Sequence, residues 1–453
     1  MNTHTANGHD SQLSFWRRVR EYAVPPSMIE TATARRLAGD WAGACAAANV
    51  DIEFRLRDVV RDHGHQLADR VRGDLRRLAP DLLRWHLPRT APDGLLRPGL
   101  TMALARYPGE RPVSLVVRTP PAWAAYGQHV SLALWDGYDD GGPPHPHPHP
   151  SRRFRYDLHR HLWDADRSEE LAARAGSGPP GSPESTEFGA PEPRCAVDRW
   201  AAEAELLLHA EGLPAGPVVV RLGRRRRLLL RPGEPVAEAA GNVRALPLLP
   251  DAATWVPPDL ALLRSGAIDP DRLHPLVAAA LAPGHQTRRT LQPPAAQRLV
   301  ECRGARHRIA VVNGVLTPID HDPAQLRREE LLAALSGTPL PCLRAVDQAH
   351  RDPTELVGVR ERLDHGDTAG ALAAVEDLLG PQAVLRPGPL RDELAAAAQR
   401  RIAYGLYRAG LTDLGPGGFP FRRRPCLHSS HRYTSAHCGP RCRPRCNPRT
   451  GTR

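Results

Sequence analysis

The sequence predicts an α+β protein in which short antiparallel sheets alternate with helical segments. Leu, Val and Ala recur at three- and four-residue spacing through the first 90 residues and again from Asp322 to Leu411, which is the period of amphipathic helices. Between these stretches, apolar residues alternate with polar ones in short runs that end at glycine-containing turns, as they do in half-buried strands. Because hairpin turns outnumber long strand–helix–strand crossovers, the sheets should be small and mainly antiparallel.

The first half of the chain should contain helices followed by strands. Pro25-Pro26 ends the first helix, and Gly64 and Pro80 interrupt the last helical segment, because glycine and proline disfavour helix interiors. After Gly109 the apolar period shortens to that of a strand. The expected helices are Ser14–Ala23, Thr31–Asn49 and Ile52–Leu87, and the expected strands are Val113–Arg118, His129–Trp135 and Phe154–Leu162.

The second half should begin with a helix and then form two small antiparallel meanders. The strongest β signal is Asn313-Gly314 between alternating apolar residues, because this dipeptide favours a two-residue hairpin turn. The expected elements are a helix over Val197–Glu211, a hairpin from Val218–Leu222 and Arg226–Arg231, short helices over 258–282, a meander over Leu299–Thr317, and helices over 322–411.

Composition divides the chain into two modules, a linker and a tail. Glycine, proline, serine and glutamate concentrate in 174–194, and three His-Pro pairs follow a Gly-Gly-Pro-Pro run; both patterns are typical of loops or linkers. The expected division is a first module over 1–173 with a His-Pro loop at 137–153, a disordered linker over 174–194, a second module with a C-terminal helical segment over 195–412, and a disordered basic tail over 413–453.

The two modules repeat some of the same local sequences. Pro80–Arg84 corresponds to Pro258–Arg264, Ala103–Ala105 to Ala280–Ala282, and Arg167–Leu171 to Arg327–Leu331. The order is kept, and the His-Pro loop accounts for extra chain in the first copy. The pattern indicates a tandem duplication of roughly 78–176 and 256–337; the alternative is chance similarity in a chain rich in Ala, Leu and Arg.

A second repeated sequence pairs Gly39–Ala44 with Gly366–Ala371, both of which begin Gly-Asp and continue Ala-Gly-Ala after one variable residue. The later copy resembles the turn of a tetratricopeptide-type helical hairpin. Two copies so far apart in the chain cannot stack into a solenoid. Each should therefore be a local helix–turn–helix packing device.

Charge and the absence of lysine limit the possible functions. All 61 basic residues are Arg, which excludes phosphate loops, kinase-type sites and Schiff-base chemistry that require Lys. The net charge is +11, but residues 421–453 contain nine Arg and no acidic residue, so the rest of the chain carries only +2. An electrostatic argument for nucleic-acid binding therefore applies to the tail alone.

The sequence favours a cytoplasmic protein with reduced thiols. No run of 18 apolar residues is present, so no membrane span is expected. Four cysteines are scattered without paired spacing through the body, at Cys45, Cys195, Cys302 and Cys342. This distribution is unlike a disulfide framework.

One candidate metal site lies in the first module. Asp157, His159 and His161 alternate on the predicted strand 154–162, so their side chains should share one face and could bind a metal ion such as zinc. The second copy offers Asp320-His321-Asp322 at the corresponding place. An alternative for Asp322 is the N-cap of the next helix, with Pro323 and Gln325 behind it. His159 and His161 could likewise be the solvated face of an edge strand.

A second candidate lies in the tail, where four cysteines stand near three histidines. The spacing of these cysteines matches no common zinc finger, and Leu427 is the only aliphatic side chain larger than Ala available for a core beside the metal. The alternatives are a disordered tail without specific metal, a zinc site, and a basic arm on nucleic acid. The candidate ligands are Cys426, Cys438, Cys442 and Cys446.

No recognised catalytic motif is present, so the leading hypothesis is a non-catalytic binding or adaptor protein that acts through a protein partner. The alternative is a metal-dependent hydrolase in which Asp157, His159 and His161 hold the ion and lower the pKa of its bound water. The third is nucleic-acid binding through the Arg-rich tail, with a steep dependence on salt.

Overall fold

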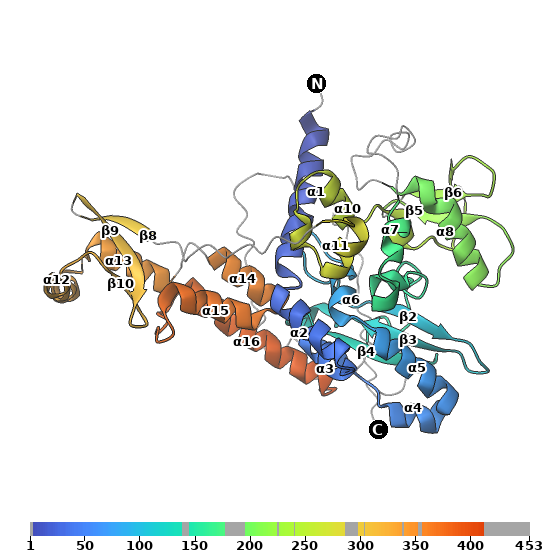
Figure 1. Ribbon diagram of the computed structural model, residues 1–453, viewed down its shortest axis with the longest axis horizontal. Coiled ribbons are helices and arrows are strands. Elements are labelled where there is room, and N and C mark those ends of the chain that lie inside the picture. The colour runs from blue at the N-terminus through green and yellow to red at the C-terminus, as the bar shows by residue number, and fades with distance from the viewer. Residues whose placement is uncertain are drawn as a thin grey trace, which may run out of the picture. The chain divides into compact units, whose positions relative to one another are not determined.

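The computed structural model confirms the α+β class (Figure 1). It describes residues 3–137, 145–176, 195–223, 226–239, 241–285, 298–302, 304–337, 339–351 and 356–411. Most of the predicted linker, part of the His-Pro loop and all of the predicted tail lie outside these residues.

The N-terminal region is helical, as predicted. Its first helix begins earlier than expected, at Thr3 instead of Ser14, and the segments after it divide into more and shorter helices. Gly39 adopts a positive φ of 80° and Gly64 one of 83°, and both separate helices that the apolar period alone would join. The helices are α1 (Thr3–Tyr22), α2 (Pro26–Leu37), α3 (Trp41–Ala47), α4 (Leu56–His63), α5 (His65–Arg77) and α6 (Pro80–His86).

A four-stranded sheet in the order β1-β4-β3-β2 forms the centre of the first half. Its strands are β1 (Val50–Ile52), β2 (Thr101–Tyr107), β3 (Val113–Arg118) and β4 (Val130–Trp135). β1 is parallel to β4 and the other pairs are antiparallel. β2 was not predicted from the sequence, because it is buried along almost its whole length. Strands that are buried on both faces lose the alternation of apolar and polar residues that marks half-buried strands.

The predicted strand Phe154–Leu162 is wrong. Arg155 forms only an isolated bridge with Ala103, and the following residues make consecutive turns that end in the 3₁₀ helix η2 (Arg160–Leu162). The alternating polar residues come from turns in which Tyr156, His159 and His161 are all buried. Two more short helices follow, η3 (Ala165–Arg167) and α7 (Glu170–Arg174), and η1 (Ala122–Ala124) precedes β4.

The second half begins with the predicted helix and hairpin. These are α8 (Val197–Ala210) and the antiparallel strands β5 (Val218–Arg221), β6 (Arg227–Leu230) and β7 (Ala237–Glu238). The short helices α9 (Asp251–Thr254), α10 (Pro258–Arg264), η5 (Pro270–Arg272) and α11 (Pro275–Leu281) follow. Leu262 and Val277 belong to the same buried cluster as Leu75 and Leu115, so α10 and α11 pack on the first half.

The repeated Pro-Asp segments have the same local structure. Asp81 in α6 and Asp259 in α10 are each 1% exposed in the first turn of a helix. Each carboxylate accepts a hydrogen bond from a residue C-terminal to the other segment: His274 Nε2 lies 3.0 Å from Asp81, and Trp85 Nε1 lies 3.3 Å from Asp259. The Ala-Leu-Ala segments differ, since one lies in β2 and the other ends α11. Duplication therefore stays a prediction.

The C-terminal region contains the predicted meander and helices. β8 (Arg298–Cys302), β9 (Ala305–Val312) and β10 (Val315–Pro318) pair in the order β10-β9-β8. Asn313 and Gly314 adopt φ values of 55° and 80°, which confirms the predicted hairpin turn. The helices are α12 (Pro323–Ser336), α13 (Pro341–Arg351), α14 (Leu356–His365), α15 (Thr368–Leu379) and α16 (Pro389–Arg408). No helix in the described ranges is both long and apolar enough to span a bilayer.

The two Gly-Asp sequences form matching helical hairpins, as predicted. Asp40 caps α3 by accepting a hydrogen bond from the Gly43 amide at 2.8 Å, and Asp367 caps α15 by accepting one from Gly370 at 2.9 Å. A Cβ atom at either glycine would overlap the carboxylate of its capping aspartate. The repeat is therefore a cap that requires glycine at the third helical position.

We expect Gly370→Ala to lower the free energy of unfolding by about 1 kcal/mol, because the added Cβ displaces the Asp367 cap. Urea unfolding followed by circular dichroism would measure it. The matched control is Gly405→Ala in the interior of α16, where a Cβ meets nothing within 4 Å; it should stabilise by roughly 0.5–1 kcal/mol. Equal effects of the two changes would contradict this account of the repeat.

Candidate functional site

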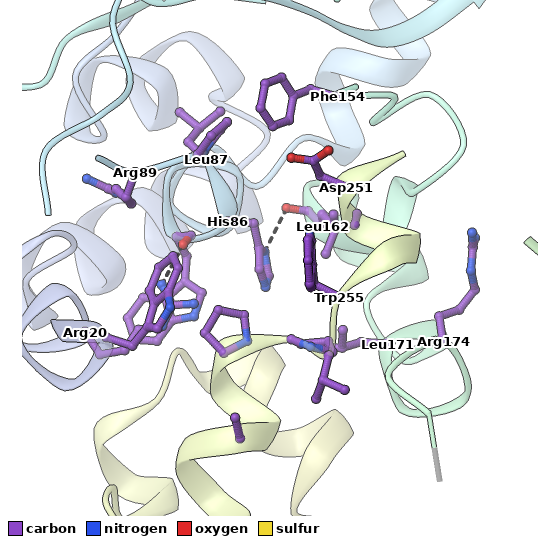
Figure 2. Close-up of a pocket in the computed structure, with 18 of the residues that line it drawn as sticks. Arg20, His86, Leu87, Arg89, Phe154, Leu162, Leu171, Arg174, Asp251 and Trp255 are labelled. Atoms are coloured by element: carbon purple, nitrogen blue, oxygen red, sulfur yellow. Dashed lines mark hydrogen bonds between the residues drawn. The ribbon is translucent and has the colours of Figure 1, made fainter. Parts of the chain in front are cut away.

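The candidate site is a pocket of about 420 Å³ lined by α1, α6, α7, α9, α10 and the segment before η2 (Figure 2). This volume falls in the range of sites for small molecules. Much of the lining is aromatic or aliphatic, which favours an apolar occupant. The principal apolar groups are Trp16, Trp85, Phe154, Tyr156, Leu171 and Trp255.

A buried ion pair fixes the wall between α1 and α10. Arg20 Nε lies 2.6 Å from Asp259 Oδ1, and Arg20 Nη2 lies 2.9 Å from Asp259 Oδ2. Arg20 and Asp259 are 5% and 1% exposed. The guanidinium carbon also lies 4.5 Å from the centre of the Trp85 ring, within the range of a cation–π contact. The bidentate geometry therefore sets the distance and rotation between the two helices.

His86 presents a hydrogen-bond acceptor at the pocket. Burial lowers its pKa to about 4, so the imidazole is neutral at neutral pH. Nδ1 lies 3.1 Å from the carbonyl oxygen of Leu162 (Figure 2) and 3.1 Å from that of Leu82. Because carbonyls only accept, the proton must be on Nδ1. Nε2 is then a lone-pair acceptor, and it is buried without a partner.

Arg89 supplies uncompensated positive charge at the pocket. Its guanidinium donates to the carbonyls of Arg84 at 2.8 Å and Gly94 at 3.4 Å, while Nε is buried without a partner. No carboxylate among the described residues makes an ion pair with it. Burial, together with Arg84 and Arg20, holds the pKa of Arg89 well below its ordinary value. An anion placed beside this guanidinium would relieve that repulsion.

The opposite edge of the pocket is electrically balanced. Arg153 Nη2 lies 2.5 Å from Asp251 Oδ2, and Arg174 Nη2 lies 2.6 Å from Glu203 Oε2. Arg89 and Arg174 lie on different sides of His86 in the close-up (Figure 2). Arg89 thus differs from Arg153 and Arg174, which also line the pocket but have carboxylate partners.

The titratable and hydroxyl groups of the pocket show no arrangement for acid–base or nucleophilic catalysis among the described residues. A general base works best with a pKa near the operating pH, whereas the pKa of His86 is about 4. Asp251 is held by Arg153, and the Ser265 hydroxyl donates to the Leu262 carbonyl at 3.0 Å. None of the residues that line the pocket forms a nucleophile–base pair in the hydrogen bonds that the structure shows.

The predicted metal ligands of the first module are placed in different environments. Asp157 is held by two 2.8 Å hydrogen bonds from Arg155. His159 contacts the Arg155 carbonyl at 2.9 Å and Glu203 at 3.3 Å. His161 lies beside His159, with ring centres 5.8 Å apart. Their ligand atoms do not converge, because the strand that would have aligned them is replaced by turns. The predicted tail ligands, Cys426, Cys438, Cys442 and Cys446, lie outside the described residues.

No sequence pattern marked His86 or Arg89 as site residues. His86 ends α6 and Arg89 follows it. The apolar pattern of this helix indicates only core packing, and the opposing wall of the pocket comes from residues 251–265. Pro258-Asp259 was visible as a repeated sequence, but its pairing with Arg20 depends on a contact across 239 positions.

Comparison with known proteins identifies no relative from which a function could be inferred. The chain matches no protein-family model, no curated protein and no solved structure.

We expect stability to fall as the pH drops from about 6.5 toward 4, because the unfolded chain protonates His86 before the folded protein does. The folded pKa of about 4 corresponds to a loss of up to about 3 kcal/mol. Urea unfolding at pH 7 and pH 4.5 would measure it. His86→Asn, which has no titrating group, should reduce the fall, whereas the same change at the exposed His209 of α8 should not. An unchanged fall in His86→Asn would show that other groups cause it.

We expect Arg20→Met to destabilise the protein by roughly 3–5 kcal/mol, because it leaves Asp259 buried without its ion partner. Adding Asp259→Leu should recover much of that loss, since the double variant buries no unpaired charge. Urea unfolding of Arg20→Met, of Asp259→Leu and of the double variant would complete a double-mutant cycle. Additive losses in this cycle would mean that the pair does not couple α1 to α10.

Proposed function

We propose that this protein is a non-catalytic binding protein for a small aromatic anion that also carries an N–H or O–H group. The observation that carries the proposal is the polar content of the pocket: an acceptor at His86 Nε2 and an unpaired cation at Arg89, both beside aromatic walls. A ligand with these features would satisfy both groups at once.

The apolar part of the ligand would supply most of the affinity. Trp16, Trp85 and Trp255 line the pocket from different elements, and aromatic pairs gain energy beyond the area they bury. The polar groups would supply selectivity, because a buried acceptor left without a donor costs about 1–3 kcal/mol. A neutral hydrocarbon would leave both His86 Nε2 and Arg89 Nε unsatisfied.

The proposal is tested with two fluorescent probes that share one skeleton. These are 8-anilinonaphthalene-1-sulfonate and N-phenyl-1-naphthylamine, which lacks the sulfonate. Both offer an aromatic surface and an N–H donor. We expect both to bind, and the sulfonate to bind about tenfold more tightly at low salt, a difference of about 1.4 kcal/mol. Fluorescence titration would measure the two dissociation constants, and equal values would contradict a cationic pocket.

Substitutions in the pocket, each with a control on the protein surface, test whether the probes bind there. Ala261→Phe, which fills the pocket from α10, should abolish binding of both probes, whereas Ala201→Phe on the exposed face of α8 should leave it unchanged.

Arg89→Gln should remove the preference for the sulfonate, and the exposed Arg401→Gln on α16 is its control. His86→Asn should weaken both probes about fivefold to tenfold through one lost hydrogen bond. Binding that survives Ala261→Phe would place the probes elsewhere and refute the proposal.

A protein partner, predicted from the sequence, has a separate candidate surface on α12. No residue of this helix is buried, and Leu331, Leu332 and Leu335 are 67%, 54% and 86% exposed. Exposed leucines gathered on one helix are typical of a surface that another protein covers. Copurification with the wild-type chain and with Leu331→Ser/Leu335→Ser would test this second candidate; a partner retained by the variant would exclude α12.

The other predictions made from the sequence concern a metal-dependent hydrolase, nucleic-acid binding and a cytoplasmic location. A hydrolase built on Asp157, His159 and His161 has no support from the geometry, since these ligand atoms do not converge. Nucleic-acid binding rests on residues 421–453, which are not described, and it stays a prediction. The cytoplasmic location also stays a prediction; Cys45, Cys302 and Cys342, which are free thiols in the structure, are compatible with it.

A further inference from the structure

Two cysteines and a histidine from separate elements converge next to the β8–β10 sheet. Cys302 ends β8, His321 lies between β10 and α12, and Cys342 is in the first turn of α13. One ligand atom from each, the two Sγ atoms and an imidazole nitrogen, lies within 4.8 Å of the others. Cys302 and Cys342 are 1% and 0% exposed. These three residues form the Cys302–His321–Cys342 cluster.

The dimensions of the cluster fit a tetrahedral zinc ion. Bonds of about 2.3 Å to sulfur and 2.0–2.1 Å to nitrogen place neighbouring ligand atoms roughly 3.3–3.8 Å apart. Separations of at most 4.8 Å reach that geometry through small side-chain rotations. Two sulfurs and one imidazole are soft donors that select zinc over calcium or magnesium, which prefer oxygen.

His321 is held in position from both sides. Asp320 accepts hydrogen bonds from the Arg308 amide at 3.1 Å and from its guanidinium at 3.1 Å. Asp322 caps α12 by accepting from the Ala324 amide at 3.1 Å. The ring of His307 stacks on that of His321 with centres 3.8 Å apart. The chain and the ring are thereby ordered before a metal binds.

The sheet beside the cluster has little apolar core of its own. Ile309 and Leu316 are its buried aliphatic side chains among the described residues, whereas Leu299, Val312 and Val315 are 60%, 42% and 53% exposed. Small units with thin cores are commonly stabilised by a metal ion or by disulfides. A metal at the cluster would join β8, the segment before α12 and α13 at one point.

We propose that Cys302, His321 and Cys342 bind one zinc ion that links the β8–β10 sheet to α13. The site is distinct from the aromatic pocket and does not depend on the function proposed for it. Its role is structural, because two of its three protein ligands are almost fully buried and because the ion would link three separate elements of the chain.

The test uses the full-length chain without an affinity tag, with Cys426, Cys438, Cys442 and Cys446 replaced by Ser so that the tail thiols do not contribute. Zinc content after dialysis is measured by elemental mass spectrometry. We expect about one zinc per chain. Cys302→Ser, Cys342→Ser and His321→Ala should each lose it, whereas Cys195→Ala and His209→Ala should retain it. Zinc content unchanged in all three ligand variants would overturn the proposal.

Two further measurements do not depend on whether those variants fold. Cobalt bound in place of zinc should show thiolate-to-metal charge-transfer absorption and the intense visible bands of tetrahedral cobalt. Removal of zinc from the unmodified cluster by a chelator should lower the thermal midpoint, and zinc should restore it. Absence of metal and of cobalt–thiolate absorption would overturn the proposal, as would a Cys302–Cys342 disulfide found by peptide mapping without reductant.

Discussion

The buried guanidinium of Arg84 is the interaction on which the described fold most depends. It is 0% exposed, and it donates to the carbonyls of Ala23 at 3.2 Å, Gly127 at 3.3 Å and His365 at 2.9 Å, and also to that of Gln128. Burial lowers its pKa to about 10, so it remains charged at neutral pH. Without a carboxylate partner, its charge is stabilised by carbonyl dipoles alone. One side chain thereby joins the end of α1, the turn before β4 and the end of α14.

This constraint also shapes the pocket. Arg89 donates to the carbonyl of Arg84 at 2.8 Å, and the two guanidinium groups raise the local positive potential. The protein balances some of these cations, as in Arg20–Asp259, and leaves Arg89 unbalanced. A fixed cation, a neutral imidazole acceptor and indole walls are the features on which the proposed binding of an aromatic anion rests. In our proposals, burial serves two different purposes: the aromatic pocket receives a ligand, and the Cys302–His321–Cys342 cluster holds elements together.

Local hydrogen bonds explain which parts of the fold could be predicted. Asp40, Asp322 and Asp367 cap helices through amides two or three residues ahead, and Asn313-Gly314 turns the chain within two residues. Such interactions depend on neighbouring residues only, so their sequence patterns are reliable. The predicted strand at 154–162 was wrong because its structure depends on contacts with distant residues rather than on neighbouring ones. Its alternation was real, but burial of Tyr156, His159 and His161 in three-dimensional contacts replaced the strand by turns.

The sequence by itself determined the α+β class, the helical hairpins, the C-terminal meander and the concentration of positive charge in residues 421–453. Only the tertiary structure decided where the chemistry lies. The pocket joins residues near 20, 86 and 255, and the cluster joins Cys302 to Cys342 through His321, with no short ligand spacing to mark it. Each contact is made between segments whose separation the local pattern does not encode. The physical reason is that packing and charge balance between distant segments select these partners.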